Sequence, residues 1–482
     1  LEAERRARLR DAVLAGPAAV SARALDQAQR AGLLARLVAA GDIERALADA
    51  GHVDGRRRAL PGAVTVNVVL GLALHSGEGY DSVLAKVVPQ VRGGTLLPGQ
   101  VPSASALSQA RTRLGAGALR LFFEQQAAGE PAARGPGASA FDLEVTGFDG
   151  TCLELPCEPE LIEAFGCPTG AKRPQARLVT LVSCGNRRIQ AAAIGSYHTS
   201  EQELVDRLAG ALRPGTVNLA DRNFFSMHRF LRFAASGAHL VWRVKNGAAS
   251  LPARITERLP DGSHLVRLRE SDAMRTRRRK DTGDPHATRL PDTIARMIEF
   301  EVRVTDERGR TRTGRIRLLT TLLDPEAYPA RALAALYAER WQVEITFLRL
   351  KTTLRGAGTV LRGHGRELIH QEIWAFLAVY NLLCDLAAQA AALDGIDPDE
   401  ISFVTVLRLT RAHLGADQPC THCAHRPEQP RQALTSAIAA SPRNRTRRNR
   451  TSPRTNAERR NGHTQKARYT ITIAESNLPK AD

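Results

Sequence analysis

The sequence predicts an α/β fold, in which an all-helical N-terminal region precedes a mixed sheet with flanking helices. Residues 1 to about 125 are rich in Ala, Leu and Arg, which are strong helix formers. From Val145 onward, short strand-like runs alternate with helical segments. A β-rich block at residues 240–325 is followed by a long helix expected from about Ala330 to Leu354.

The N-terminal helical domain is expected over residues 1–126. Within it, Pro102 to Leu114 opens with Pro and Ser and carries Arg111 and Arg113 near its end. Two interpretations stay open: a DNA-reading helix, or an ordinary packed helix whose arginines favour its C-terminus. The Ala-, Gly- and Pro-rich residues 126–139 predict a linker.

The central region, residues 140–415, has the order of a mixed sheet. Arg177 to Ser183 and Arg188 to Ile194 predict a hairpin, because Cys-Gly-Asn lies between them. Ser200 and Glu203 have the spacing of a capping box that opens a helix. Val217 to Ala220 then predicts a short buried strand.

The charge is strongly basic, with 68 Lys and Arg against 50 Asp and Glu and a net charge of +18. Residues 426–482 alone hold 13 Lys and Arg against 4 Asp and Glu, half of the excess. They predict a basic low-complexity tail that is disordered and can be removed from Arg443 onward without loss of the activity of the rest. The charge makes nucleic acid the expected partner, ahead of an anionic membrane.

A membrane partner is not expected. The longest uncharged apolar run, Leu60 to Leu74, is interrupted by Pro61 and falls short of the roughly 20 residues of a spanning helix. No signal segment is recognised, and seven irregularly spaced cysteines favour reduced thiols. We therefore expect a cytoplasmic protein.

Two aspartates stand where strands are expected to end. Asp149 lies in Gly-Phe-Asp-Gly-Thr after a short apolar run, and Asp221 directly follows the strand that ends at Ala220. In open α/β sheets ligands bind at the carboxyl ends of strands. The alternative is an ordinary turn or N-cap aspartate.

The long helix places four polar side chains on one face. At about 100° per residue, Tyr337, Arg340, Glu344 and Lys351 lie within an arc of about 60°. A carboxylate beside two cations and a phenol suits a metal ion together with phosphate oxygens. The alternative is a solvated face with Arg340 and Glu344 as an i,i+4 ion pair.

These motifs together resemble a known family. Gly-Phe-Asp-Gly-Thr, then Ala-Asp-Arg-Asn-Phe-Phe-Ser, then Y-x-x-R-W-x-x-E-x-x-F-x-x-x-K from Tyr337 to Lys351, is similar to the DDE transposases of bacterial insertion sequences. Within that group the insertion-sequence-4 family carries a Tyr-Arg-Glu-Lys signature on one helix. Arg58 to Pro61 and Ser108 to Gly115 resemble the family's helical N-terminal domain, and the resemblance covers about residues 15–415.

The resemblance implies a ribonuclease-H-like catalytic core with a β-rich insertion at 240–325. Its catalytic residues and metal ligands would be Asp149, Asp221 and Glu344, which hold two Mg²⁺ or Mn²⁺ ions. The implied activity is cut-and-paste transposition: binding of terminal inverted repeats, cleavage at the element ends and joining of the 3′-ends to target DNA.

DNA contacts are implied for Tyr337, Arg340 and Lys351, and also for Arg243 and Lys245 on a basic strand. The implied partners are double-stranded DNA and a second copy of the chain in a synaptic homodimer. Two rivals stay open: a nuclease of the same fold that only hydrolyses DNA, and an inactive DNA-binding remnant.

Two further clusters of residues each leave a functional and a structural interpretation open. Cys420, His422, Cys423 and His425 have half of a zinc-site spacing, and a reduced surface loop is the alternative. The basic run from Arg275 to Lys280 predicts a DNA-backbone patch or a solvated loop.

Overall fold

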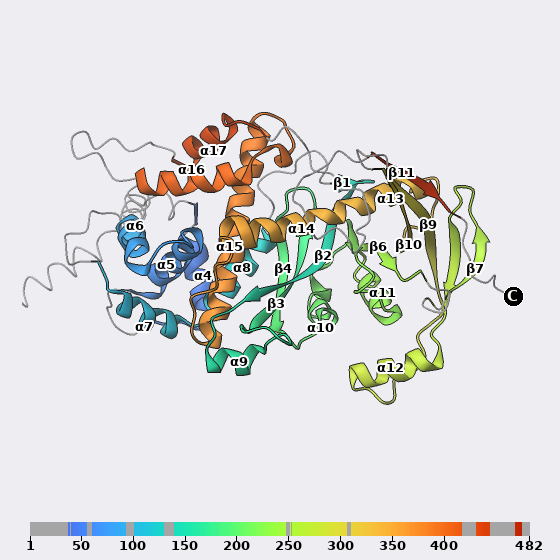
Figure 1. The fold of residues 1–482 in the computed structure, drawn as a ribbon, viewed down its shortest axis with the longest axis horizontal. Helices are drawn as coiled ribbons and strands as arrows, with labels where there is room; N and C mark the ends of the chain where they lie inside the picture. The colour runs from blue at the N-terminus through green and yellow to red at the C-terminus, as the bar shows by residue number, and fades with distance from the viewer. Residues whose placement is uncertain are drawn as a thin grey trace, which may run out of the picture. The chain divides into compact units, whose positions relative to one another are not determined.

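The computed structural model divides into two compact units, drawn in Figure 1. Unit 1 groups residues 1–129, 352–393 and 401–442, and unit 2 groups residues 130–351, 394–400 and 443–482. The structure describes residues 37–38, 40–54, 60–92, 101–129, 139–246, 251, 253–305, 310–416, 430–443 and 468–474. Most of residues 352–415, expected in the central domain, thus group with the N-terminal helices.

Unit 1 is helical in the part that the structure describes. Its helices are α4 (Ala40–Asp49), α5 (Gly62–Leu74), α6 (Tyr80–Arg92), α7 (Ala104–Leu114), α8 (Gly117–Ala128), α15 (Arg366–Leu393), α16 (Phe403–Ala416) and α17 (Pro430–Ala439). The helix α15 packs against α5, α8 and α17, which explains why it joins this unit. This helix is long and apolar enough to cross a membrane, but 72% of its 18-residue apolar segment is buried inside the protein. A buried core helix can have the same length and apolar composition.

The helix α7 confirms the expected start, because the Ser103 side chain accepts a hydrogen bond from the Ala106 backbone N–H. Arg111 is 2% exposed, and its Nε donates to Gln371 Oε1 at 2.9 Å. Its guanidinium also lies 3.9 Å from the Glu372 carboxylate. Arg111 is therefore part of the packing of unit 1, whereas Arg113 is exposed.

Unit 2 contains one long sheet. Its strands are β1 (Ser139–Ala140), β2 (Leu143–Glu154), β3 (Gln175–Ser183), β4 (Ile189–Ser196), β5 (Thr216–Ala220), β6 (His239–Val244), β7 (Ala253–Arg258), β8 (His264–Leu268), β9 (Thr293–Thr305), β10 (Thr311–Thr320) and β11 (Arg468–Ile473). The order at one end is β4-β3-β2-β5-β6, with β2, β3 and β4 antiparallel and β5 and β6 parallel to β2. This is the ribonuclease-H-like arrangement that the resemblance implied, and the predicted hairpin is β3 and β4.

Helices cover both faces of this core sheet, because alternate residues of each strand point to opposite sides. Phe148, Ala220 and Trp242 share an apolar cluster with residues of α10 (Glu201–Asp206) and α11 (Met227–Ala234). Val145, Val217 and Val241 belong to the cluster on the other face, where α13 (Ala330–Leu336) packs. Figure 1 shows α13 on one side of the sheet and α10 and α11 on the other.

The β-rich insertion extends the same sheet. The strand β10 pairs antiparallel with β6, and β9, β8 and β7 follow in order, with the surface helix α12 (Asp272–Thr282) between β8 and β9. The predicted block at 240–325 was wrong at its start, because β6 is the fifth strand of the core and its parallel pairing with β5 fixes it there.

The prediction of a disordered tail over 426–482 needs correction at two described segments, α17 and β11. The strand β11 pairs antiparallel with Phe300 to Thr305, while β8 pairs with Thr293 to Met297 along the same edge of β9. Ile471 and Ile473 pack against the cluster that contains α13. Alternating apolar residues on a free strand edge explain this order.

We therefore predict that a chain ending after residue 467 is destabilised, because it exposes half of one edge of β9 and removes two isoleucines whose burial is worth about 2 kcal/mol together. Thermal unfolding should show the midpoint falling by several degrees, and cleavage activity should fall with it. A chain ending after residue 474 is the matched control and should unfold like the full chain. Equal midpoints for both truncations would contradict this role of β11.

Candidate active site

Asp221 directly follows the end of β5, as predicted, but the prediction that a strand ends at Asp149 was wrong, because β2 continues to Glu154 and pairs Asp149 with Thr180 of β3. In the ladder between β2 and β5, Val145 lies opposite Val217 and Gly147 opposite Leu219, a constant offset of 72 residues. The same offset sets Asp149 beside Asp221. Each side chain points away from the cluster of Phe148 and Ala220, toward the face that carries α13.

A helical stretch lies directly over this pair of strands. The segments η3 (Tyr337–Arg340), α14 (Trp341–Leu348) and η4 (Arg349–Leu354) continue α13 without a gap, as 3₁₀, α and π turns. A Cβ at Gly147 would lie 2.8 Å from Val343 Cγ2. The glycine therefore permits the close approach of α14 to β2.

Three of the four residues of the predicted helix face, Tyr337, Arg340 and Lys351, reach β2 or β5, although the helix is not uniform. Tyr337 is buried, and its hydroxyl lies 3.4 Å from the Ala220 carbonyl oxygen. Lys351 Nζ donates to Thr151 Oγ1 at 3.1 Å. In this structure Tyr337 supports the end of β5, and its DNA contact stays a prediction.

Arg340 joins two of the three predicted acids. One of its terminal nitrogens lies 3.2 Å from Asp149 Oδ2, and the other donates to Glu344 Oε1 at 2.9 Å. All three side chains are largely buried. Burial lowers the pKa of Arg340, but Tyr337, Asp149, Asp221 and Glu344 raise it to a net value above normal. The guanidinium thus lies within the field of all three predicted acids.

The pKa of Asp149 is raised to about 6. Burial is the main cause, and Glu344 and Glu201 add to it, while Arg340 and the Gly150 N–H, 2.9 Å from Oδ1, oppose it. The attraction of Arg340 therefore does not offset the cost of burying the Asp149 carboxylate.

Asp221 lies between a strand end and a basic strand. Its Oδ1 accepts from the Arg222 backbone N–H at 2.7 Å and lies 3.7 Å from an Arg243 guanidinium nitrogen. Because Ala220 is paired with Trp242 in the parallel ladder, Arg243 is the next residue beside Asp221. Arg243 therefore faces the site, and Lys245, two residues further, is exposed.

Comparisons with known proteins decide the family. The family described as "Transposase DDE domain" matches residues 141–382, half of the chain, and "Insertion element 4 transposase N-terminal" matches residues 28–124. The chain belongs to the DDE transposases. Its N-terminal match places it with those of insertion sequence 4.

This transposase is similar to two proteins of Escherichia coli (strain K12). It is 29% identical over 371 residues to the transposase InsG for insertion sequence element IS4, covering 75% of this chain and 78% of InsG. It is 27% identical over 205 residues to the putative transposase InsZ, covering 42% of this chain and 66% of InsZ. A solved piggyBac transposase synaptic complex with hairpin DNA aligns at 10% identity and a TM-score of 0.41, over 86% of this chain and 85% of that one.

The donor set of the transposase suits a divalent cation. Three carboxylates are hard oxygen ligands of the kind that Mg²⁺ and Mn²⁺ prefer, and a cationic guanidinium already lies between two of them. Among the described residues, no group of three or more His, Cys, Asp and Glu side chains is arranged closely enough to hold a metal ion as they stand. The chemistry of the ligands fits, and their closer approach is a proposal.

Sequence reasoning missed Glu201 and Thr151. Glu201 opens α10, and a Cβ at Gly150 would lie 2.6 Å from its Oε1, so this carboxylate touches the backbone next to Asp149. The capping-box spacing predicted the start of the helix, and Ser200 Oγ does accept from the Glu203 N–H at 3.0 Å. Nothing in that spacing indicated that the side chain of Glu201 reaches β2.

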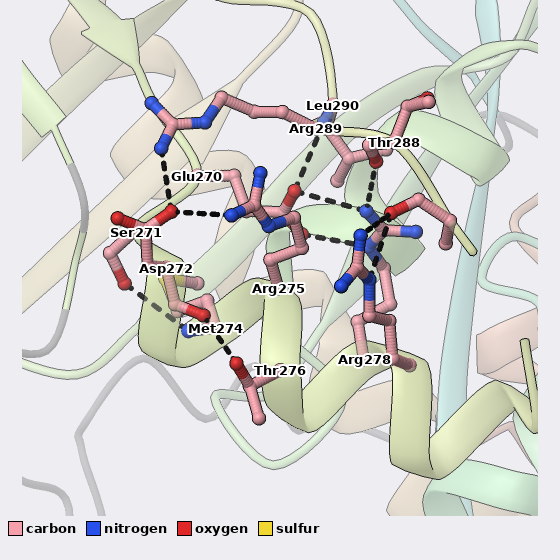
Figure 2. A network of polar contacts seen from close by, with 12 residues as sticks. Glu270, Ser271, Asp272, Met274, Arg275, Thr276, Arg278, Thr288, Arg289 and Leu290 are labelled. Carbon is pink, nitrogen blue, oxygen red and sulfur yellow. Dashed lines mark hydrogen bonds and ion pairs between the residues drawn. The ribbon is translucent and has the colours of Figure 1, made fainter. Parts of the chain in front are cut away.

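The basic run on α12 is neither a uniform DNA patch nor a loop. Figure 2 shows Arg278 bound to Glu270, through Nε at 2.7 Å and Nη2 at 3.0 Å. Arg275 pairs with Asp272, and Arg279 donates to the Ala287 carbonyl oxygen. These three arginines bind within the insertion, while Arg277 and Lys280 are exposed.

The possible zinc ligands from Cys420 to His425 lie outside the described residues. Cys152, Cys157 and Cys167, which follow Asp149 in the sequence, form no disulfide, and Cys157 Sγ donates to the Lys172 carbonyl oxygen.

We predict that Gly147→Ala displaces α14, because the new Cβ would overlap Val343. Overpacking of this kind costs about 1–3 kcal/mol of the free energy of unfolding. Denaturant unfolding of Gly147→Ala, Val343→Ala and the double variant checks this. The double variant should recover part of the loss, and strictly additive losses would contradict the contact.

Asp149→Asn should stabilise the metal-free transposase above about pH 6. Because the folded-state pKa of this acid lies above its unfolded value, stability is greatest while it is protonated and is lost as pH rises from about 4 through 6. The melting temperature of the wild type in chelator should fall over that range relative to Asp149→Asn, by a few degrees. Parallel pH profiles of the two proteins would contradict the raised pKa.

Proposed function

We propose that this transposase binds the terminal inverted repeats of an insertion sequence, cleaves the DNA at the element ends and joins the 3′-ends to target DNA. The observation that carries the proposal is the position of Arg340, which pairs with Asp149 of β2 and with Glu344 and lies within the field of Asp221. Acids and a guanidinium arranged around neighbouring parallel strands suit phosphodiester chemistry.

Asp149, Asp221 and Glu344 would hold two Mg²⁺ or Mn²⁺ ions, which when bound activate the attacking oxygen and stabilise the leaving 3′-oxygen. The raised pKa of Asp149 supports this assignment, because a bound cation favours the ionised form of a carboxylate that burial disfavours.

The cations of the site would bind the DNA backbone. Arg340 can exchange a carboxylate for a phosphate, since its planar fork binds either in a bidentate manner. Lys351 is held near β2 by Thr151, and Arg243 lies beside Asp221. Lys245 would extend this row, and Tyr337 would contact the backbone if the end of β5 shifts on DNA binding.

The assembly and place of action follow from the reaction. Joining two element ends requires both to be held together, so we propose a homodimer that forms on DNA in the bacterial cytoplasm. The rival within the same site is a nuclease that hydrolyses DNA and does not join it.

A strand-transfer assay distinguishes these functions. Precleaved terminal-repeat DNA, a target plasmid and Mg²⁺ should give joined product, and Glu344→Gln should lower its yield by at least about 100-fold, because it removes a ligand charge. Glu339→Gln is the matched control, since Glu339 lies on the same helical stretch and accepts a hydrogen bond from Gln342 instead.

Cleavage without joining would favour the nuclease. Binding of the repeat without cleavage by the wild type would contradict an active enzyme. DNA binding by Glu344→Gln should remain, because the variant keeps every cation that faces the site.

A further inference from the structure

Glu201 on α10 lies between the two segments that carry the aspartates. Asn223 Nδ2 donates to Glu201 Oε2 at 2.8 Å, two residues after Asp221. The other oxygen of Glu201 lies against Gly150, where even a Cβ would come within 2.6 Å. The Glu201 carboxylate therefore touches the backbone next to Asp149 and holds the turn that follows Asp221.

Further hydrogen bonds hold the turn after Asp221 against α10. Gln202 Nε2 donates to the Asn223 carbonyl oxygen at 2.9 Å, so two successive residues of α10 bind the same asparagine. Arg229 on α11 donates through Nε and Nη2 to Asp206 at 2.8 Å each, and through Nη1 to the Phe224 carbonyl oxygen. The turn 221–226 is thus fixed to α10 from both sides.

We propose that Glu201 is a positioning residue of the active site, which sets the spacing between Asp149 and Asp221 through its bond to Asn223. The inference rests on the proposed function and adds to it a residue outside the three acids. Phosphoryl transfer on two ions requires ligands placed within about 0.5 Å, and a shift of about 1 Å can cost 100-fold in rate.

The contact is specific in its donor and acceptor. Asparagine supplies the N–H and glutamate the oxygen, so aspartate at 223 would set two carboxylates against each other. Glutamine at 201 keeps an oxygen acceptor of the same size. Exchanging both groups, as in E201Q/N223D, restores one donor and one acceptor.

The test compares Glu201→Ala, Glu201→Gln, Asn223→Asp and E201Q/N223D. Glu203→Gln is the matched control, because Glu203 lies on the same helix and its exposed side chain pairs with Arg207. Two quantities are measured: the rate of cleavage of terminal-repeat DNA against Mg²⁺ concentration, and the rise in melting temperature that Mn²⁺ causes in the DNA-free protein.

Glu201→Ala and Asn223→Asp should cleave at least about tenfold more slowly, need more Mg²⁺ for half-maximal rate and show a smaller Mn²⁺ shift. Glu201→Gln, E201Q/N223D and Glu203→Gln should stay within about threefold of the wild type on the scale of such positioning effects. If Glu201→Ala fails to fold, Asn223→Asp and its rescue by the exchange decide the matter.

Three results would overturn the inference: wild-type behaviour of Glu201→Ala and Asn223→Asp, no rescue by the exchange, or a loss in Glu201→Gln as large as in Glu201→Ala. The last would show that the charge of Glu201, not its hydrogen bond, is what counts. Failure of the proposed function is distinct, because the wild type would then neither cleave nor differ from Glu344→Gln.

Discussion

The parallel register of β2 and β5 is the constraint on which the candidate active site depends. A constant offset of 72 residues runs through the ladder, and the same interval separates Asp149 from Asp221. A slip of one residue would turn one aspartate into the apolar cluster on the other face. The fully buried positions of Phe148 and Ala220 on that face oppose such a slip, so the core fixes the spacing of the acids.

The ion pairs of Arg340 follow from that register. Once α14 lies on Gly147, Arg340 and Glu344 lie near β2, and the guanidinium can reach both Asp149 and Glu344. The sequence placed these residues on one helix face and left open a solvated ion pair. The structure buries that pair and adds Asp149 to it, which a helical wheel cannot show because Asp149 comes from another element.

Local patterns predicted what depends on local physics. Turn and capping residues and short apolar runs predicted the hairpin of β3 and β4, the N-cap of α7 and the strand before Asp221. These local patterns did not predict the contacts of Arg111, Arg278 and Glu201, because each of these side chains binds a residue of another element or one that is distant in the sequence. The sequence does not show whether a basic residue binds Glu270 or a phosphate. It therefore could not distinguish the arginines of α12 that pair within the protein from the basic residues that are exposed.

The insertion also holds the start of the helical stretch that carries Glu344, which argues against treating the insertion as a separable module. Arg296 on β9 is fully buried, pairs with Asp261 and donates to the Tyr328 carbonyl oxygen at 2.7 Å. Asp261 Oδ2 in turn accepts from the Ala330 N–H at 2.8 Å, the first residue of α13. The helix α13 continues into the stretch that carries Arg340 and Glu344. The insertion between Asp221 and Glu344 therefore also supports the helical stretch that positions Glu344. The strand β11 reinforces the same helix from the far end of the sequence, since Ile471 and Ile473 pack in its cluster.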